Sequence, residues 1–174
     1  QSYANKTNEI RRLLEASPAD PAQANQIYSE VRGLKVNYAF ALGGYINHTV
    51  YFDGIGKLDQ QPTGELAEAI ADAFGSVQTW KRSLKATGIG ARGWAYLAYS
   101  YDENRLTTLI GDAQDTFPMW DHALILALDV YEHAYYLDFQ TRRGDYIDAY
   151  LRCLDWDALN ARYRAALQHG AALA

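Results

Sequence analysis

An aspartate and a histidine four residues apart, Asp129 and His133, form the pair in this chain best suited to binding a metal ion. The apolar run just before them, residues 124–128, predicts a short buried strand that ends at Asp129. If a turn or helix follows the strand, the spacing brings both side chains to one face, where a carboxylate oxygen and an imidazole nitrogen can share an ion. A capping aspartate beside a core histidine would have the same spacing, so the pair alone leaves both interpretations open.

The composition limits the classes of function. The chain has 174 residues, enough for one domain or for two fused subdomains around a common core. A net charge of -5 gives no general attraction to nucleic acid or to an anionic membrane, and no apolar run is long enough to span a bilayer. We therefore expect neither partner. The single cysteine, Cys153, excludes a disulfide within the chain and fits a reducing compartment, so we expect a cytoplasmic location.

Two helices are predicted at the N-terminus, over residues 1–15 and from residue 23 to residue 51, and they would form an antiparallel hairpin. His48 lies near the end of the second helix. Its side chain would face the core if the apolar stripe of that helix runs through Val36, Phe40 and Tyr51.

Two consecutive glycines, Gly43 and Gly44, interrupt the second predicted helix one turn before His48. Glycine lowers helix propensity, so the pair could mark a kink. Because glycine has no side chain, the pair could instead allow another backbone, or the site itself, to approach the helix closely. The sequence leaves both interpretations open.

The rest of the chain predicts a region of mixed helices and strands. A linker over residues 52–63 divides an N-terminal domain, residues 1–57, from a C-terminal domain, residues 58–174. The glycine-rich residues 87–92 are expected to form a loop. We expect helices over residues 64–74, 77–86, 145–154 and 156–169, and strands over residues 93–101, 105–110 and 124–130.

Four stretches resemble, in the same order, motifs of the iron/manganese superoxide dismutases. Residues 129–136 (DVYEHAYY) are similar to the signature D-x-[WY]-E-H-A-Y-Y of that family, and residues 45–49 contain its N-H-[ST] motif. Residues 93–97 (GWAYL) resemble its G-W-A-[WY]-L strand, and residues 112–115 resemble the stretch with its active-site glutamine. Four motifs in order, within a match that covers nearly the whole chain, are much more specific than any one of them.

The resemblance implies an α+β fold, in which an N-terminal antiparallel helical hairpin packs on a C-terminal α/β domain with a three-stranded antiparallel sheet. It also implies one manganese or iron ion per subunit, bound by His48, Asp129 and His133, and the conversion of superoxide to dioxygen and hydrogen peroxide. Imidazole and carboxylate ligands suit first-row metals of this kind. Another metal enzyme that reacts with peroxide or dioxygen could use the same ligands.

One metal ligand of the family has no counterpart in this sequence. The family's first histidine lies on the first helix, upstream of a tyrosine that matches Tyr3, and would therefore precede Gln1. The simplest expectation is that the sequence lacks an N-terminal segment. The alternative is a protein with this fold and an incomplete metal site, which would act as a structural or binding protein.

The resemblance also assigns residues around the ion. Gln114 would bind the metal-bound solvent, and its position after the second strand, with Gly44 at the alternative helix position, favours manganese. Tyr3 would screen the substrate channel and relay protons. Tyr131 and Phe52 stand where tryptophan is commoner in the family, so both positions keep an aromatic ring.

Three more residues would act at a subunit interface or at the entrance to the site. Glu132 would bind a ligand histidine of the partner subunit and Tyr136 matches an interface tyrosine, so we expect a homodimer or homotetramer through these two residues. Arg142 would attract superoxide despite the net charge of -5, although a solvated arginine is an equally simple interpretation. His122 lies outside the motifs. It could be a surface residue or a neighbour of the site, and we expect a surface position.

Overall fold

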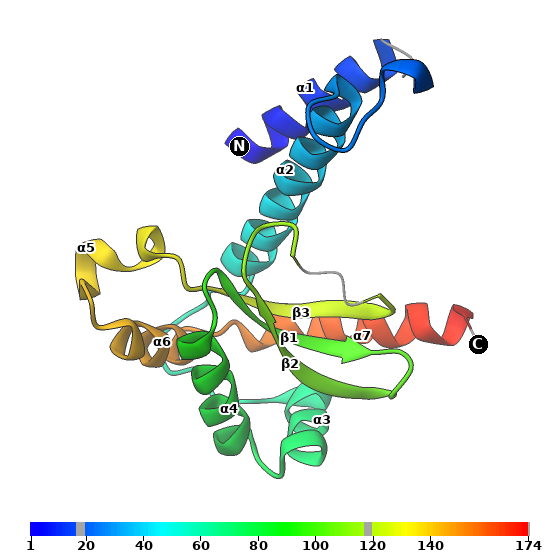
Figure 1. Ribbon diagram of the computed structural model, residues 1–174. Coiled ribbons are helices and arrows are strands. Elements are labelled where there is room, and N and C mark those ends of the chain that lie inside the picture. The colour runs from blue at the N-terminus through cyan, green and yellow to red at the C-terminus, as the bar shows by residue number, and fades with distance from the viewer. Residues whose placement is uncertain (17–19, 117–119, 174) are drawn as a thin grey trace.

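The centre of the molecule is a three-stranded antiparallel sheet in the order β2-β1-β3 (Figure 1). The structure is a computed structural model that describes residues 1–16, 20–116 and 120–173. The strands are β1 (Trp94–Ser100), β2 (Arg105–Gly111) and β3 (His122–Asp129), and the central strand β1 is buried along its whole length. The predicted α+β fold and its antiparallel sheet are confirmed.

The strand register brings the end of β3 beside the beginning of β1. Trp94 pairs with Gly111 of β2 on one side and with Asp129 of β3 on the other. The backbone N–H of Val130 donates to the carbonyl of Gly93 at 2.8 Å, which extends this pairing by one residue. Asp129 therefore leaves the sheet at a fixed position beside Trp94.

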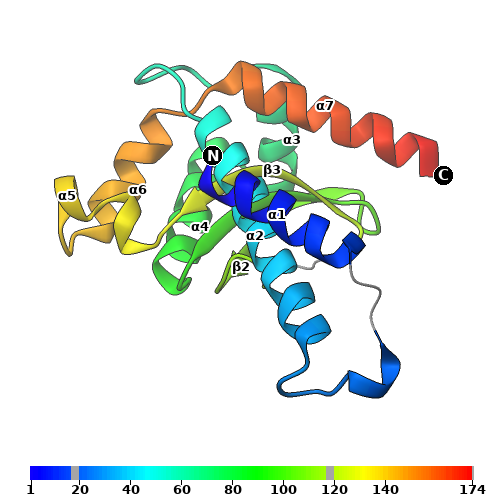
Figure 2. The ribbon, with the colours of Figure 1, turned by 90° about the horizontal axis from the view of Figure 1, so that it is seen from above.

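The first two helices, α1 (Ser2–Ala16) and α2 (Glu30–Asp53), form an antiparallel hairpin that projects from the sheet (Figures 1 and 2). The predicted start of the second helix at residue 23 is wrong. The side-chain oxygen of Asn25 accepts the backbone N–H groups of Ile27 and Tyr28, at 2.9 and 2.8 Å, and this local turn competes with helix formation. Among the described residues between α1 and α2, the one helical segment is the short 3-10 helix η1 (Pro21–Gln23).

The predicted core face of α2 is also wrong in part. Val36 and Phe40 are 45% and 41% exposed, because the outer part of the hairpin extends beyond the sheet. The buried side of α2 lies nearer its C-terminal end, which contacts β3. It carries small and polar residues as well as apolar ones, namely Ala41, Gly44, Asn47, Val50 and Tyr51.

Four longer helices surround the sheet: α3 (Gly64–Phe74), α4 (Val77–Gly90), α6 (Arg143–Arg152) and α7 (Trp156–Leu173). Helix α4 contacts β1, β2 and α6, whereas α7 contacts β3 and α3. Residues 87–90 belong to α4, so the loop predicted there begins later than expected. The short helix η2 (Glu132–Ala134) follows β3, where a turn or helix was expected, whereas the short helix α5 (Tyr136–Phe139) was not predicted.

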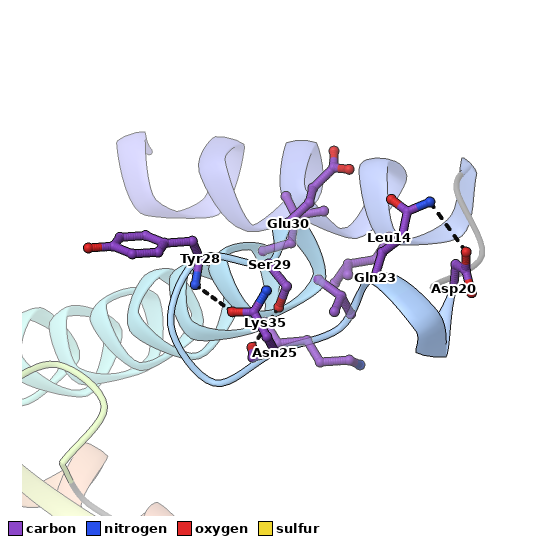
Figure 3. A pocket seen from close by; sticks show the side chains of 10 residues that line it. Leu14, Asp20, Gln23, Asn25, Tyr28, Ser29, Glu30 and Lys35 are labelled. Carbon is purple, nitrogen blue, oxygen red and sulfur yellow. Dashed lines mark hydrogen bonds between the residues drawn. The ribbon is translucent and has the colours of Figure 1, made fainter.

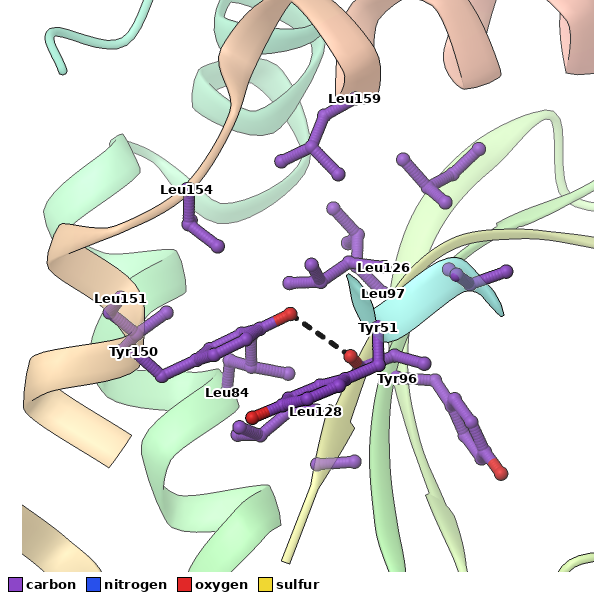
Figure 4. Packing of buried hydrophobic residues seen from close by; sticks show 14 of the residues in the cluster. Tyr51, Leu84, Tyr96, Leu97, Leu126, Leu128, Tyr150, Leu151, Leu154 and Leu159 are labelled. Atoms are coloured by element: carbon purple, nitrogen blue, oxygen red, sulfur yellow. Dashed lines mark hydrogen bonds between the residues drawn. The ribbon is translucent and has the colours of Figure 1, made fainter. Parts of the chain in front are cut away.

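The hydrophobic core joins the hairpin to the rest of the molecule (Figure 4). Tyr51 of α2 stacks on Tyr150 of α6, with ring centroids 5.3 Å apart, among leucines of β1, β3, α4 and α7. Val50 and Tyr51 of α2 belong to the same core as the sheet. The predicted division into two domains between residues 57 and 58 stays a prediction. Over the described ranges, no helix combines the length and apolar character that a bilayer-spanning segment needs.

The two glycines of α2 allow close approach, and α2 is continuous through them. A Cβ on Gly43 would lie 2.0 Å from the carbonyl oxygen of Gln114, and a Cβ on Gly44 would lie 2.6 Å from the ring of Tyr3. Both distances are far shorter than a van der Waals contact. The glycines therefore let α2 pass directly against two residues that the sequence assigned to the site.

We predict that Gly43→Ala destabilises the fold and displaces the loop that carries Gln114. The new methyl group would overlap a backbone carbonyl, and we expect a loss of about 1–3 kcal/mol in the free energy of unfolding. Gly33→Ala is the matched control on the same helix, because its Cβ would meet nothing within 4 Å. We expect this control to gain up to about 1 kcal/mol from better helix propensity. Equal effects of the two substitutions in urea denaturation would contradict the predicted contact.

Candidate metal centre

Three side chains from three elements converge beside the end of β3. Asp129 is the last residue of β3, His133 lies on η2 four residues later, and His48 comes from α2. His133 Nε2 lies 3.0 Å from Asp129 Oδ2, and His48 Nε2 lies 3.6 Å from the same oxygen. The three donor atoms all lie within 4.8 Å of one another. The sequence interpretation that paired Asp129 and His133 on one face therefore agrees with their observed proximity.

The two separations from Asp129 Oδ2 are compatible with binding to a single first-row metal ion. Bonds of about 2.1 Å place two ligand atoms about 3.0 Å apart at a right angle and about 3.6 Å apart at an angle of about 120°. These values match the 3.0 Å and 3.6 Å separations from Asp129 Oδ2. Two imidazole nitrogens and a carboxylate oxygen are suitable ligands for iron or manganese.

The ring of His48 is held in the orientation that a ligand needs. Its Nδ1 lies 2.7 Å from the carbonyl oxygen of Gly44, one turn earlier on α2, so Nδ1 carries the proton and Nε2 is free to coordinate. The indole of Trp94 contacts the imidazole edge to face, with ring centroids 5.0 Å apart. The His48 side chain is only 22% exposed.

His133 has a more open environment. Its ring stacks on Tyr131, with centroids 5.4 Å apart, and the side chain is 59% exposed. The only hydrogen bond of this ring among the described residues is the one between Nε2 and Asp129. Its second nitrogen, Nδ1, is therefore available to a group from outside the chain.

The Asp129 carboxylate is almost completely buried. Desolvation raises its pKa, while His133, the backbone N–H of Tyr131 and His48 act in the opposite direction. The N–H of Tyr131 donates to Oδ1 at 3.0 Å, which leaves Oδ2 directed at the two histidines. A buried carboxylate of this kind costs folding free energy unless a cation compensates it.

Two of the predicted supporting residues, Gln114 and Tyr3, lie beside His48. The Tyr3 ring stacks on the imidazole with centroids 5.2 Å apart, and Gln114 Nε2 donates to the Tyr3 hydroxyl at 3.4 Å. The other end of the amide, Oε1, accepts the indole N–H of Trp94 at 3.1 Å. The structure therefore arranges Trp94, Gln114 and Tyr3 as one hydrogen-bonded chain next to the three donor atoms.

The structure places Glu132, Tyr136 and Arg142 on the surface. Glu132 and Tyr136 flank the exposed His133 in sequence, on η2 and α5. The guanidinium of Arg142 pairs with Asp145 at 2.8 Å and lies over the ring of Phe139. Within the described part of the chain, none of the three contacts the cluster of donor atoms through a hydrogen bond or ion pair.

His122 lies at the start of β3, outside the cluster, where its Nδ1 contacts the carbonyl of Trp120 at 2.8 Å. It is partly exposed, in accordance with the prediction of a surface position.

Sequence reasoning assigned no role to Trp94, Asn47 or Arg143. Trp94 fixes Gln114, and Asn47 Nδ2 donates to the Gln114 carbonyl at 3.3 Å. Both residues lie inside the matched motifs, so their positions could have indicated a supporting role. Arg143, rather than its neighbour Arg142, is fixed by the structure: it donates to the carbonyl of Ala91 at 2.8 Å and to the Tyr135 hydroxyl at 3.1 Å.

A separate cavity of about 580 Å³ lies at the outer end of the hairpin (Figure 3). Its lining comes from the end of α1, the connection between the helices and the start of α2, and includes Leu14, Asn25, Tyr28 and Lys35. None of the three donor residues lines it. The cavity therefore belongs to a different part of the molecule from the candidate metal centre.

Comparison with known proteins agrees with this geometry. Residues 62–162 match the family model described as the C-terminal domain of iron/manganese superoxide dismutases. The chain is 34% identical to "Superoxide dismutase [Fe]" of Aquifex aeolicus, over 97% of this chain and 80% of the relative. It is 35% identical to "Superoxide dismutase [Mn] 2" of Haloferax volcanii, over 97% of this chain and 82% of the relative. The chain belongs to the iron/manganese superoxide dismutase family.

Proposed function

We propose that the protein is a superoxide dismutase, which converts two superoxide anions and two protons to dioxygen and hydrogen peroxide. His48, Asp129 and His133 would hold one manganese or iron ion per subunit. The observation that carries this proposal is the convergence of their donor atoms within 4.8 Å of one another. When bound, the ion supplies the one-electron redox couple through which one superoxide is oxidised and the next is reduced.

The negative charge of Asp129 would shift the reduction potential of the ion in the direction that this cycle requires. An anionic ligand stabilises the trivalent state more than an imidazole does, so Asp129 would lower the reduction potential relative to a site with histidines alone. Both half-reactions need a potential between those of the two superoxide couples. The burial of the carboxylate strengthens its electrostatic effect, because little water is present to screen it.

Gln114 and Tyr3 would relay protons to the site and restrict the access of molecules to it. The Gln114 amide is fixed at one end by Trp94, so its other end points toward the Tyr3 hydroxyl. Such a chain could hold a solvent molecule near the site and pass a proton toward the reduced substrate. The Tyr3 ring, which stacks on His48, would narrow the channel to small substrates.

We favour manganese over iron for this chain. Gln114 follows β2 in the sequence. The family's alternative position for this glutamine is on the second helix, and there this chain has Gly44. The relatives named above include both iron and manganese proteins at similar identity, so identity alone gives no preference. Metal content after expression in medium with both metals tests this choice.

We further propose that two copies of the chain associate through Glu132 and Tyr136. The exposed Nδ1 of His133 lacks a partner within the described chain, and a glutamate from a second copy would supply one. Tyr136 is half exposed and would lie in the same interface. A dimer or a tetramer could contain this contact. A cytoplasmic location is proposed from the single cysteine, Cys153.

Arg142 would attract superoxide to the site from the surface. A local cation is needed for this purpose because the net charge of the chain is -5. Its ion pair with Asp145 is exposed, so the side chain can reorient at little cost.

The first test removes one proposed ligand. We expect His48→Ala to lose bound metal and to decrease the rate of superoxide decay by at least about 100-fold, because a lost ligand opens a coordination position. His122→Ala is the matched control, since His122 lies outside the donor cluster. Elemental analysis and stopped-flow decay of superoxide measure both quantities. Full activity of a metal-free sample would exclude the proposal, and a wild-type protein without metal or activity would support a structural or binding role.

The second test uses the metal-free protein. Because burial raises the pKa of Asp129 in the folded state, its carboxylate disfavours folding at neutral pH, and this cost disappears as the pH falls through the raised pKa. We expect Asp129→Asn to abolish metal binding but to stabilise the metal-free fold at pH 7 by about 1 kcal/mol. The stability difference should shrink as the pH falls.

The control for this test is Asp145→Asn, which changes an exposed carboxylate paired with Arg142. We expect it to change the stability by less than about 0.5 kcal/mol at any pH. Urea denaturation at several pH values measures both variants. A clear loss of stability in metal-free Asp129→Asn at pH 7 would contradict the argument from burial.

The third test addresses association. We expect Glu132→Ala to weaken self-association by at least about tenfold, because it removes a charged hydrogen bond from each half of a symmetric interface. Glu103→Ala, in the turn between β1 and β2, is the control and should associate like the wild type. Sedimentation equilibrium measures the association constant. Unchanged association of the Glu132 variant would place the interface elsewhere.

A further inference from the structure

A chain of two buried tyrosine hydroxyls ends on the backbone of Asp129. The Tyr146 hydroxyl donates to the Asp129 carbonyl at 2.8 Å, and the hydroxyls of Tyr51 and Tyr146 are 3.1 Å apart. A hydroxyl has one proton to donate, and that of Tyr146 is used by the carbonyl. Tyr51 is therefore the donor to Tyr146. Burial raises the pKa of both tyrosines, so both stay protonated at neutral pH.

The chain connects the elements that carry two of the proposed metal ligands. Tyr51 lies on α2, one turn after His48, and Tyr146 lies on α6. The acceptor belongs to Asp129 itself, at the end of β3. The two hydrogen bonds therefore link α2, which carries His48, to Asp129 at the end of β3 through α6.

The rings alone do not account for the hydroxyls. Tyr51 stacks on Tyr150 and Tyr146 stacks on Tyr135, with centroids 5.3 and 5.0 Å apart, and phenylalanine could make both contacts. A buried hydroxyl is costly unless it is paired. Once paired, it fixes distance and direction in a way that ring packing does not.

We propose that Tyr51 and Tyr146 are positioning residues that hold His48 and Asp129 at the separation required for metal binding. This inference rests on the proposed metal site. Without the hydroxyl chain, α2 can shift against β3, and the Nε2 to Oδ2 separation of 3.6 Å is no longer fixed. A looser site would release its ion faster, and the arrangement of ligands around the ion would vary more from molecule to molecule.

Tyr150 provides a matched control within the same cluster. It lies on α6 one turn after Tyr146, it is equally buried, and its hydroxyl donates to the carbonyl of Ala127 at 3.0 Å. Ala127 is on β3, two residues before Asp129. Tyr150→Phe therefore removes a comparable hydrogen bond to the same strand without breaking the link to α2.

The experiment compares the full chain with Tyr51→Phe, Tyr146→Phe, both together, and Tyr150→Phe, each loaded with Mn²⁺. The readouts are the rate of metal release to excess chelator, the electron paramagnetic resonance spectrum of the bound ion, and the thermal unfolding midpoint. We expect about tenfold faster release and a broader spectrum for Tyr51→Phe and Tyr146→Phe. The double variant should release metal no faster than the worse single variant, because both hydroxyls belong to one chain.

Tyr150→Phe should lower the unfolding midpoint but keep the release rate and spectrum of the wild type. The inference is overturned if the Tyr51 and Tyr146 variants match Tyr150→Phe in both metal readouts. If Tyr146→Phe does not fold, Tyr51→Phe still decides, because it keeps the bond to Asp129. A wild-type protein that binds neither Mn²⁺ nor Fe²⁺ would overturn the proposed function. Variants that match Tyr150→Phe in a wild type that binds Mn²⁺ would overturn this inference alone, which separates the two failures.

Discussion

The structure depends on the contact between the C-terminal half of α2 and the end of β3, where a buried carboxylate faces an imidazole. Asp129 cannot be solvated at this position, and His48 approaches it from a separate part of the chain. Packing holds the two together even though burying the carboxylate is unfavourable. Such a cost beside three converging donor atoms is expected of a site shaped for binding rather than for stability alone.

The close approach of α2 is possible only because side chains are absent where the helix meets its neighbours. Gly43 and Gly44 bring the helix against the carbonyl of Gln114 and the ring of Tyr3. The same segment then orients His48 through the Gly44 carbonyl. One short stretch of helix thus sets how closely His48 approaches Asp129, how its ring is oriented, and which ring nitrogen carries the proton.

The sequence predicted the strands, most helices and the three converging donors, because local patterns and ordered motifs specify them. It did not predict where α2 begins, since the turn at Asn25 overrides the helical periodicity. It also placed Phe40 in the core, because a periodic pattern does not reveal how far the neighbouring sheet extends. The pairing of Tyr51 with Tyr146 joins residues 95 positions apart, and no local rule indicates it.

The unequal exposure of the two histidines has a consequence for the order of assembly. His48 and Asp129 are built into the packed core, whereas His133 lies on a single 3-10 turn with most of its side chain in solvent. Two donors are therefore in place as soon as the chain has folded, and the third forms the outer wall. An ion would enter past the exposed His133, so folding can precede metal uptake. A neighbouring molecule that covers His133 would then close this route after the ion has bound.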